Sequence, residues 1–156
     1  MESSIQVGVA DRTEAVRDEV VREEPAARVS DSRLSAYFEL TKPRITFLVV
    51  LTAAAGYAVG AKGGLSLARF LWTSLGIALL SSGISALNQY IERDLDRLMN
   101  RTKLRPLPTG RIVSVRALLF GAVLSAAGLA VLALMVSWLT ALLGFATLVG
   151  YLFAYT

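Results

Sequence analysis

Three side chains with oxygen ligands recur at every fourth position of one short stretch: Asn88, Glu92 and Asp96. On a continuous α-helix this spacing places them along one face, about 40° and about 6 Å apart at each step. Two bare carboxylates so placed would repel each other. A hard divalent cation such as Mg²⁺ removes that repulsion, because it binds carboxylate and carbonyl oxygens together with phosphate. This oxygen-ligand stripe therefore favours a site for a divalent cation, most naturally Mg²⁺.

A third carboxylate, Asp94, does not share that face. It lies about 200° from Glu92 around the same helix. Residues 45–156 contain only three acidic residues, all between positions 92 and 96, against nine basic ones. Asp94 is expected either to mark the end of the helix or to pair with a nearby arginine, namely Arg93, Arg97 or Arg101.

A dense run of cationic side chains follows the stripe. Pro106 and Pro108 keep this run from continuing as a helix. Arginine forks match phosphate oxygens in pairs. A carboxylate-bound Mg²⁺ beside several cations, at the opening of an apolar cavity, suits a ligand with a diphosphate head and a hydrophobic tail. The run consists of Arg97, Arg101, Lys103, Arg105 and Arg111.

Each half of this pattern also has a simpler interpretation. The basic run alone could serve only to fix the orientation of the chain in a membrane. The carboxylates alone could form ion pairs along a helix next to the membrane. The two together favour a site, because an orientation signal has no use for a stripe of carboxylates.

The composition indicates a membrane protein and limits its chemistry. The 156 residues are 54% hydrophobic, with a mean hydropathy of +0.56. The chain contains no cysteine and no histidine, which excludes thiolate and imidazole chemistry from these residues. Catalysis by this chain must use carboxylates, amides, hydroxyls, Lys, Arg or a bound cation.

Four apolar runs predict an all-α fold, a polytopic transmembrane helical bundle of about four spans that is part of a larger bundle. Residues 1–36 lack a signal-peptide core and are expected to form a disordered cytoplasmic tail. Residues 37–156 would form the N-terminal part of the membrane domain. Because the last run stops abruptly, the chain is expected to be truncated at its C-terminus. The predicted spans are residues 45–61, 70–87, 117–136 and 141–156, with an uncharged turn at 137–140.

The distribution of Lys and Arg predicts the orientation. Residues 92–116 carry seven basic side chains, the loop after the first span carries two, and the turn after the third carries none. Basic loops stay on the cytoplasmic side. The N-terminus and the loop at residues 88–116 are therefore expected to be cytoplasmic.

At these residues the chain resembles a known family. The pattern Asn88-x3-Glu92-x3-Asp96 resembles the first acidic motif of the UbiA superfamily of intramembrane prenyltransferases, which reads Asn-x3-Asp-x3-Asp. Glu92 departs from it by one methylene, and the family's second acidic motif has no counterpart here. The resemblance covers roughly residues 37–156. Two further strings resemble the haem-farnesylating branch: Thr41-Lys42-Pro43-Arg44, and Arg101-Thr102-x2-Arg105-Pro106-Leu107-Pro108-x-Gly110.

The resemblance implies an enzyme that transfers a farnesyl group from farnesyl diphosphate to haem B, giving haem O for a terminal oxidase. It implies that Asn88, Glu92 and Asp96 are catalytic residues that hold Mg²⁺, directly or through water. It also implies a bacterial inner membrane and no nucleic-acid partner. Tyr90 or Tyr57 could stabilise an allylic cation. This chain alone is expected to be inactive, since half the metal site is missing. The residues expected to bind the diphosphate are Lys42, Arg101 and Arg105, with Arg44, Lys103 and Arg93 as helpers.

Two alternatives stay open. The same superfamily chemistry could act on an aromatic or quinone precursor as the acceptor. A membrane transporter could use the acidic cluster to bind a permeant cation. The transporter is disfavoured, because the carboxylates lie at the end of a span and neighbouring arginines would repel cations.

Overall fold

The computed structural model describes residues 33–61, 64 and 66–154, and the described part of the chain is helical without strands. The predicted all-α fold is therefore confirmed. In chain order the helices are α2 (Arg33–Leu40), α3 (Pro43–Gly60), α4 (Leu67–Asp96), α5 (Ser114–Val131), the π-helical turn η1 (Leu132–Val136) and α6 (Trp138–Ala154).

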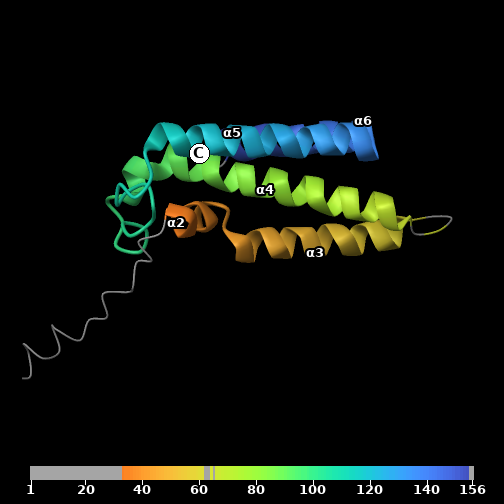
Figure 1. The fold of residues 1–156 in the computed structure, drawn as a ribbon, viewed down its shortest axis with the longest axis horizontal. Helices are drawn as coiled ribbons and strands as arrows, with labels where there is room; N and C mark the ends of the chain where they lie inside the picture. The colour runs from red at the N-terminus through yellow and green to blue at the C-terminus, as the bar shows by residue number, and fades with distance from the viewer. Residues whose placement is uncertain (1–32, 62–63, 65, 155–156) are drawn as a thin grey trace, which may run out of the picture. The chain divides into compact units, whose positions relative to one another are not determined.

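The long helix α4 is the centre of the described bundle. It lies between α3 on one side and α5 with α6 on the other (Figure 1). Within the described part of the chain, three helical segments are long and apolar enough to cross a membrane: Pro43–Gly60, Leu67–Asp96 and Ser114–Val136. The fourth predicted span corresponds to α6, which has 17 residues and is shorter than these three.

Small residues let α4 and α5 approach closely. A Cβ atom added at Gly83 would lie 2.6 Å from the backbone nitrogen of Ser125. One added at Gly128 would lie 2.6 Å from the backbone nitrogen of Leu80. Such distances leave no room for a side chain, so glycine is required at both positions. This contact fixes α4, and with it the face that carries the oxygen-ligand stripe.

Helix α3 runs antiparallel to α4. Pro43 occupies its first turn, where a missing N–H costs nothing. The Thr46 and Ser81 hydroxyl oxygens lie 3.4 Å apart and join the two helices. None of the 18 residues of α3, all of which the structure describes, is buried. Apolar side chains on this helix are therefore exposed on the surface of the described bundle.

The predicted turn at residues 137–140 is wrong in extent. Only Ser137 leaves the helical conformation, with φ −168° and ψ 153°. The Ser137 hydroxyl accepts a hydrogen bond from the Thr140 backbone N–H at 3.2 Å. A serine that caps the first turn in this way lets α6 begin at Trp138.

Helix α2 was not predicted. The expected tail at residues 1–36 lies outside the described residues up to position 32, but positions 33–36 are helical. Ala36 and Leu40, at 1% and 0% exposure, pack in one apolar cluster with Ala86 of α4. Burial of these side chains accounts for a helix that a short mixed-charge segment would not form alone.

Candidate active site at the end of helix α4

The oxygen-ligand stripe lies on one uninterrupted helix. Helix α4 continues through Asp96, so Asn88, Glu92 and Asp96 share a face, as the spacing predicts. Asn88 and Asp96 are 2% and 4% exposed, and Glu92 is partly buried. Two ionisable side chains thus lie close together where water has limited access.

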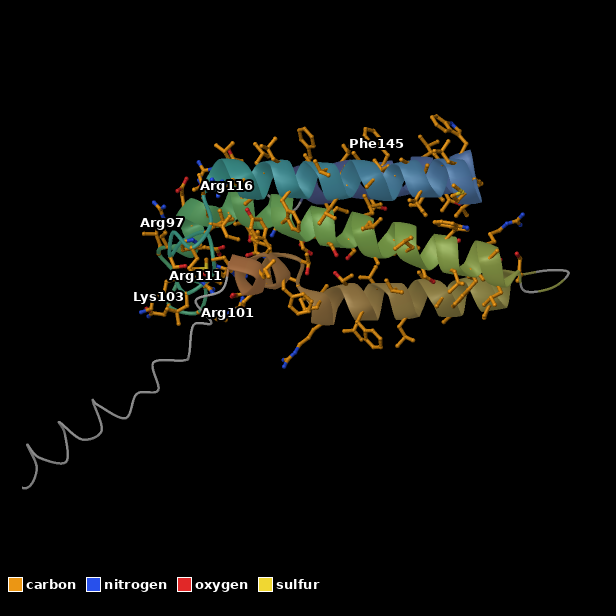
Figure 2. All side chains as sticks on the ribbon, viewed as in Figure 1. Arg97, Arg101, Lys103, Arg111, Arg116 and Phe145 are labelled. Carbon is orange, nitrogen blue, oxygen red and sulfur yellow. The ribbon has the colours of Figure 1, made fainter. Side chains whose placement is uncertain are left out.

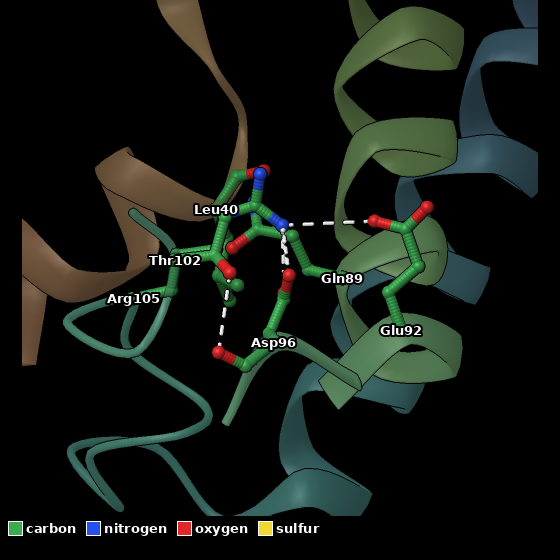
Figure 3. Close-up of polar contacts among 6 residues, drawn as sticks. All are labelled: Leu40, Gln89, Glu92, Asp96, Thr102 and Arg105. Atoms are coloured by element: carbon green, nitrogen blue, oxygen red, sulfur yellow. Dashed lines mark hydrogen bonds and ion pairs between the residues drawn. The ribbon is translucent and has the colours of Figure 1, made fainter. Parts of the chain in front are cut away.

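Arg105 binds both carboxylates of the stripe. Its Nη1 donates to Asp96 Oδ1 at 2.8 Å and to Oδ2 at 2.6 Å. The same nitrogen lies 3.6 Å from Glu92 Oε2 (Figure 3). Charge-assisted hydrogen bonds of this kind are among the strongest in proteins. In this structure, therefore, an arginine offsets the repulsion that we expected a metal ion to remove.

The loop after α4, residues 97–113, folds back to bring Arg105 to the stripe. The Thr102 hydroxyl donates to the backbone carbonyl of Asp96 at 3.1 Å. Leu107 and Ile112, at 3% and 5% exposure, pack in the same apolar cluster as Leu40. The loop consists of turns, as its prolines predict. Its buried apolar side chains anchor it against the ends of α2 and α4.

Lys42 also approaches the stripe. It lies between α2 and α3, partly buried. Burial, and after it the positive charge of Arg105, lower the pKa of Lys42, while Glu92 and Asp96 act in the opposite direction. Lys42 is thus within electrostatic range of the two carboxylates that Arg105 binds.

The other predicted cations are placed elsewhere. Arg93 lies 3.6 Å from Asp94 and stacks over the ring of Tyr90 at 4.5 Å. Arg101 and Lys103 are exposed at the loop end of the bundle (Figure 2), where Lys103 donates to Asn100 at 3.2 Å. Among the described residues, ion pairs to the stripe come from Arg105 alone. Arg44 is exposed and lines a hollow of about 470 Å³ with Lys42.

Asp94 pairs with nearby arginines, which is one of its two predicted alternatives. It pairs with Arg93 and, at 4.0 Å, with Arg97. The helix does not end there, since Asp96 is still helical. Asp94 is therefore an exposed carboxylate on the same helix as Asp96 but in a different environment.

The two tyrosines named as possible cation stabilisers lie at different ends of the bundle. The Tyr57 hydroxyl lies 3.4 Å from the Ser66 carbonyl oxygen and its ring packs on Phe70. Phe70 precedes Asn88 by 18 residues of α4, or about 27 Å. Tyr57 is thus at the opposite end of the bundle, and Arg93 covers a face of the Tyr90 ring. The expectation that Tyr57 stabilises a cation at this site is therefore wrong, whereas the same expectation for Tyr90 stays a prediction.

Sequence reasoning missed Gln89. This residue is 2% exposed, and its Nε2 donates to the Leu40 carbonyl oxygen at 3.0 Å. The signal available was an amide side chain at the end of an apolar span, adjacent to Asn88. The stripe drew attention to Asn88 alone, because Gln89 does not follow the four-residue spacing.

An apolar groove lies along the side of α4 that carries the stripe. It has a volume of about 590 Å³ and lies between α3, α4 and α6. Ile77, Ser81 and Ser85 line it from α4. Asn88 follows Ser85 by about one helical turn on the same side of α4. The groove and the stripe are therefore consecutive parts of one helix face.

The ligands of the stripe fit a hard cation. Asn88 Oδ1 is buried and lacks a hydrogen-bond partner among the described residues. A buried acceptor without a partner costs about 1–3 kcal/mol. The structure contains no group of three His, Cys, Asp or Glu side chains arranged for a metal within its described part. Two carboxylates and one unpartnered amide oxygen nevertheless match the preference of Mg²⁺.

Comparison with known proteins defines the class. The model of the UbiA prenyltransferase family matches residues 49–156, and the chain belongs to this family. With its apolar helices, this membership indicates a multi-pass membrane protein.

The similar curated proteins are more specific. Protoheme IX farnesyltransferase of Solibacter usitatus is 46% identical over 129 residues, which is 77% of this chain and 44% of the relative. Those of Shewanella baltica and Marinobacter nauticus are 45% and 44% identical, over 78% and 77% of this chain and 40% of each relative. The chain thus spans about two fifths of the length of these relatives. No solved structure matches it.

Proposed function

We propose that the protein takes part in Mg²⁺-dependent transfer of a farnesyl group from farnesyl diphosphate to haem B within the membrane, giving haem O for a terminal oxidase. The names of its relatives support the reaction class and the haem acceptor. The observation that carries the proposal is a buried oxygen-ligand stripe, joined by Arg105, at the end of an apolar groove.

Each part of the site has a role in this reaction. Asn88, Glu92 and Asp96 would hold the metal. Bound there, Mg²⁺ would supply positive charge to the diphosphate as it leaves. Arg105 and Lys42 would bind diphosphate oxygens, which gain negative charge when the bond to the allylic carbon breaks. Arg101, Arg44, Lys103 and Arg93 lie apart from the stripe here and stay secondary candidates for the diphosphate.

The groove suits the isoprenoid chain. Its lining is largely aliphatic, with serine and threonine hydroxyls between the apolar side chains. An apolar chain in this groove would place its diphosphate beside the stripe. Apolar walls would also keep water from an allylic cation before the haem vinyl group reacts.

The proposed setting is a bacterial inner membrane, with the N-terminus and residues 88–116 on the cytoplasmic side. The seven basic residues between positions 92 and 116 support this orientation. A soluble diphosphate would then reach the stripe from the cytoplasm.

Product analysis tests the proposal. Membranes containing the full-length protein that carries this chain are incubated with farnesyl diphosphate, haem B and Mg²⁺, and the haem fraction is examined by mass spectrometry. Farnesylated haem should form, and chelation of Mg²⁺ should abolish it. Prenylation of an aromatic or quinone precursor in place of haem would overturn the proposed acceptor, and product formed in the chelator would overturn the metal.

A further inference from the structure

The backbone at Lys42 adopts a conformation that needs outside support. Lys42 has φ 46° and ψ 63°, and it is the one non-glycine residue with positive φ in the part of the chain that the structure describes. Residues with a Cβ atom rarely adopt this left-handed backbone conformation. Such a residue persists only where its surroundings fix it.

Two side chains hold the peptide units just before Lys42. Gln89 Nε2 donates to the carbonyl oxygen of Leu40 at 3.0 Å, across 49 residues of sequence. The Thr46 hydroxyl donates to the carbonyl oxygen of Thr41 at 2.9 Å. Gln89 and Leu40 are almost fully buried, at 2% and 0% exposure. A hydrogen bond shielded from water in this way resists exchange with solvent.

Gln89 also belongs to the side of α4 that carries the stripe. It precedes Asp96 by seven residues, so the two side chains lie about 20° apart around the helix. Figure 3 shows Gln89 close to Leu40, Arg105 and Asp96, and its amide donates to the Leu40 carbonyl oxygen. One helix face therefore carries the metal ligands and the amide that fixes the approach of Lys42.

We propose that Gln89 is a positioning residue for diphosphate binding: its bond to the Leu40 carbonyl sets the α2–α3 junction so that the Lys42 ammonium faces the ligand beside Arg105. This inference rests on the proposed function, since it takes the ligand head to be a diphosphate. Gln89 itself does not touch the ligand. A side chain that only anchored α2 would affect all ligands of the groove equally.

A double-mutant cycle separates these two roles. Gln89→Met keeps the length of the side chain and removes the N–H donor, and Lys42→Met removes the charge. The dissociation constants of farnesyl diphosphate and of farnesol, which lacks the charged head, are measured for the purified protein in nanodiscs with Mg²⁺. Thr73→Val is the matched control, because Thr73 bonds only within the first part of α4, to the Arg69 carbonyl.

The positioning role predicts a specific pattern. Gln89→Met should weaken farnesyl diphosphate binding about tenfold and leave farnesol binding unchanged. Lys42→Met should weaken diphosphate binding by at least as much, and adding Gln89→Met to it should have no further effect, because coupled residues are not additive. The control should bind both ligands like the wild type.

Other outcomes overturn the inference. If the two substitutions multiply, or if farnesol binding falls in parallel, Gln89 acts on the fold and not through Lys42. If Gln89→Met does not fold, Gln89→Asn, which keeps the amide on a shorter arm, must show the same coupling to Lys42. A wild type that binds farnesol but not the diphosphate would overturn the proposed function itself, whereas normal wild-type binding with uncoupled variants overturns only the role of Gln89.

Discussion

Nη1 of Arg105 donates hydrogen bonds to both oxygens of the Asp96 carboxylate, at 2.8 and 2.6 Å. These are the oxygens that a divalent cation on the stripe would use. A divalent cation held there would therefore compete with Arg105 for Asp96, and a diphosphate would relieve this competition by accepting hydrogen bonds from Arg105. This relationship leads to the first prediction.

Replacing Arg105 should have opposite effects on the affinity for Mg²⁺ and on the affinity for farnesyl diphosphate. In Arg105→Gln, Mg²⁺ alone should bind about tenfold more tightly, because its competitor is gone, whereas farnesyl diphosphate should bind about tenfold more weakly. Calorimetric titration with Mg²⁺, with and without the diphosphate, measures both. Arg97→Gln is the control, since Arg97 is exposed and pairs with Asp94 at 4.0 Å. Unchanged affinity for Mg²⁺ alone would show that the two cations do not compete.

Substitution of Asp96 and substitution of Asp94, on the same helix, should have different effects on the rate of farnesyl transfer. Asp96→Asn should lower the rate of farnesyl transfer by at least about 100-fold, because it removes a charged metal ligand. Asp94→Asn makes the same chemical change two residues away, on an exposed side chain, and should leave the rate within about twofold, since exposed ion pairs contribute little. Haem product formed per minute at saturating substrate is the measurement. Equal rates for the two variants would remove Asp96 from the site.

The pH dependence of diphosphate binding should reflect the loss of the proton from the Lys42 ammonium. Burial, and then the charge of Arg105, lower the pKa of Lys42 below that of an ordinary lysine. The ammonium binds an anion only while protonated, so its contribution is present below this lowered pKa and is lost as the pH rises through it. Affinity for farnesyl diphosphate should thus fall in the alkaline range.

Lys42→Arg supplies the comparison, because a guanidinium stays charged throughout that range. Its binding curve should lack the alkaline fall. Lys103→Arg, at an exposed position, should keep it. A fall that persists in Lys42→Arg would assign the titration to another group.

The close approach of α4 and α5 should make Gly83 intolerant of a methyl group. Gly83→Ala would place a carbon 2.6 Å from the Ser125 backbone nitrogen and should destabilise the protein by about 1–3 kcal/mol through overpacking. Gly56→Ala, with nothing within 4 Å, should stabilise α3 slightly, by up to about 1 kcal/mol. Thermal unfolding in detergent measures both. Similar stability of the two variants would contradict the packing described for this pair of helices.

Local patterns predict much of the fold and part of the site. The apolar runs predict α3, α4 and α5, since a span is a property of consecutive residues. The stripe follows from helical spacing, which also explains why Asp94 is separate from Asp96.

What the sequence does not predict depends on contacts between distant residues. Arg105 reaches Asp96 only because the loop turns back, and a run of basic residues does not reveal which member will do so. Helix α2 and the role of Gln89 depend on a contact across 49 residues. The break before α6 involves Ser137 alone, because its hydroxyl caps the first turn of that helix. The sequence of residues 137–140 predicts a longer turn than the structure contains.

The packing of α2 has a consequence for biosynthesis. Leu40 and Ala36 share one apolar cluster with Leu107, Ile112 and Ala117, so α2 can reach its final position only after residue 117 has left the ribosome. At roughly 5–20 residues per second, several seconds separate the synthesis of α2 from that of its partners. Helix α2, the earliest helix described here, can therefore dock only after α4 and the loop that follows it have been synthesised, and Lys42 reaches the stripe only then.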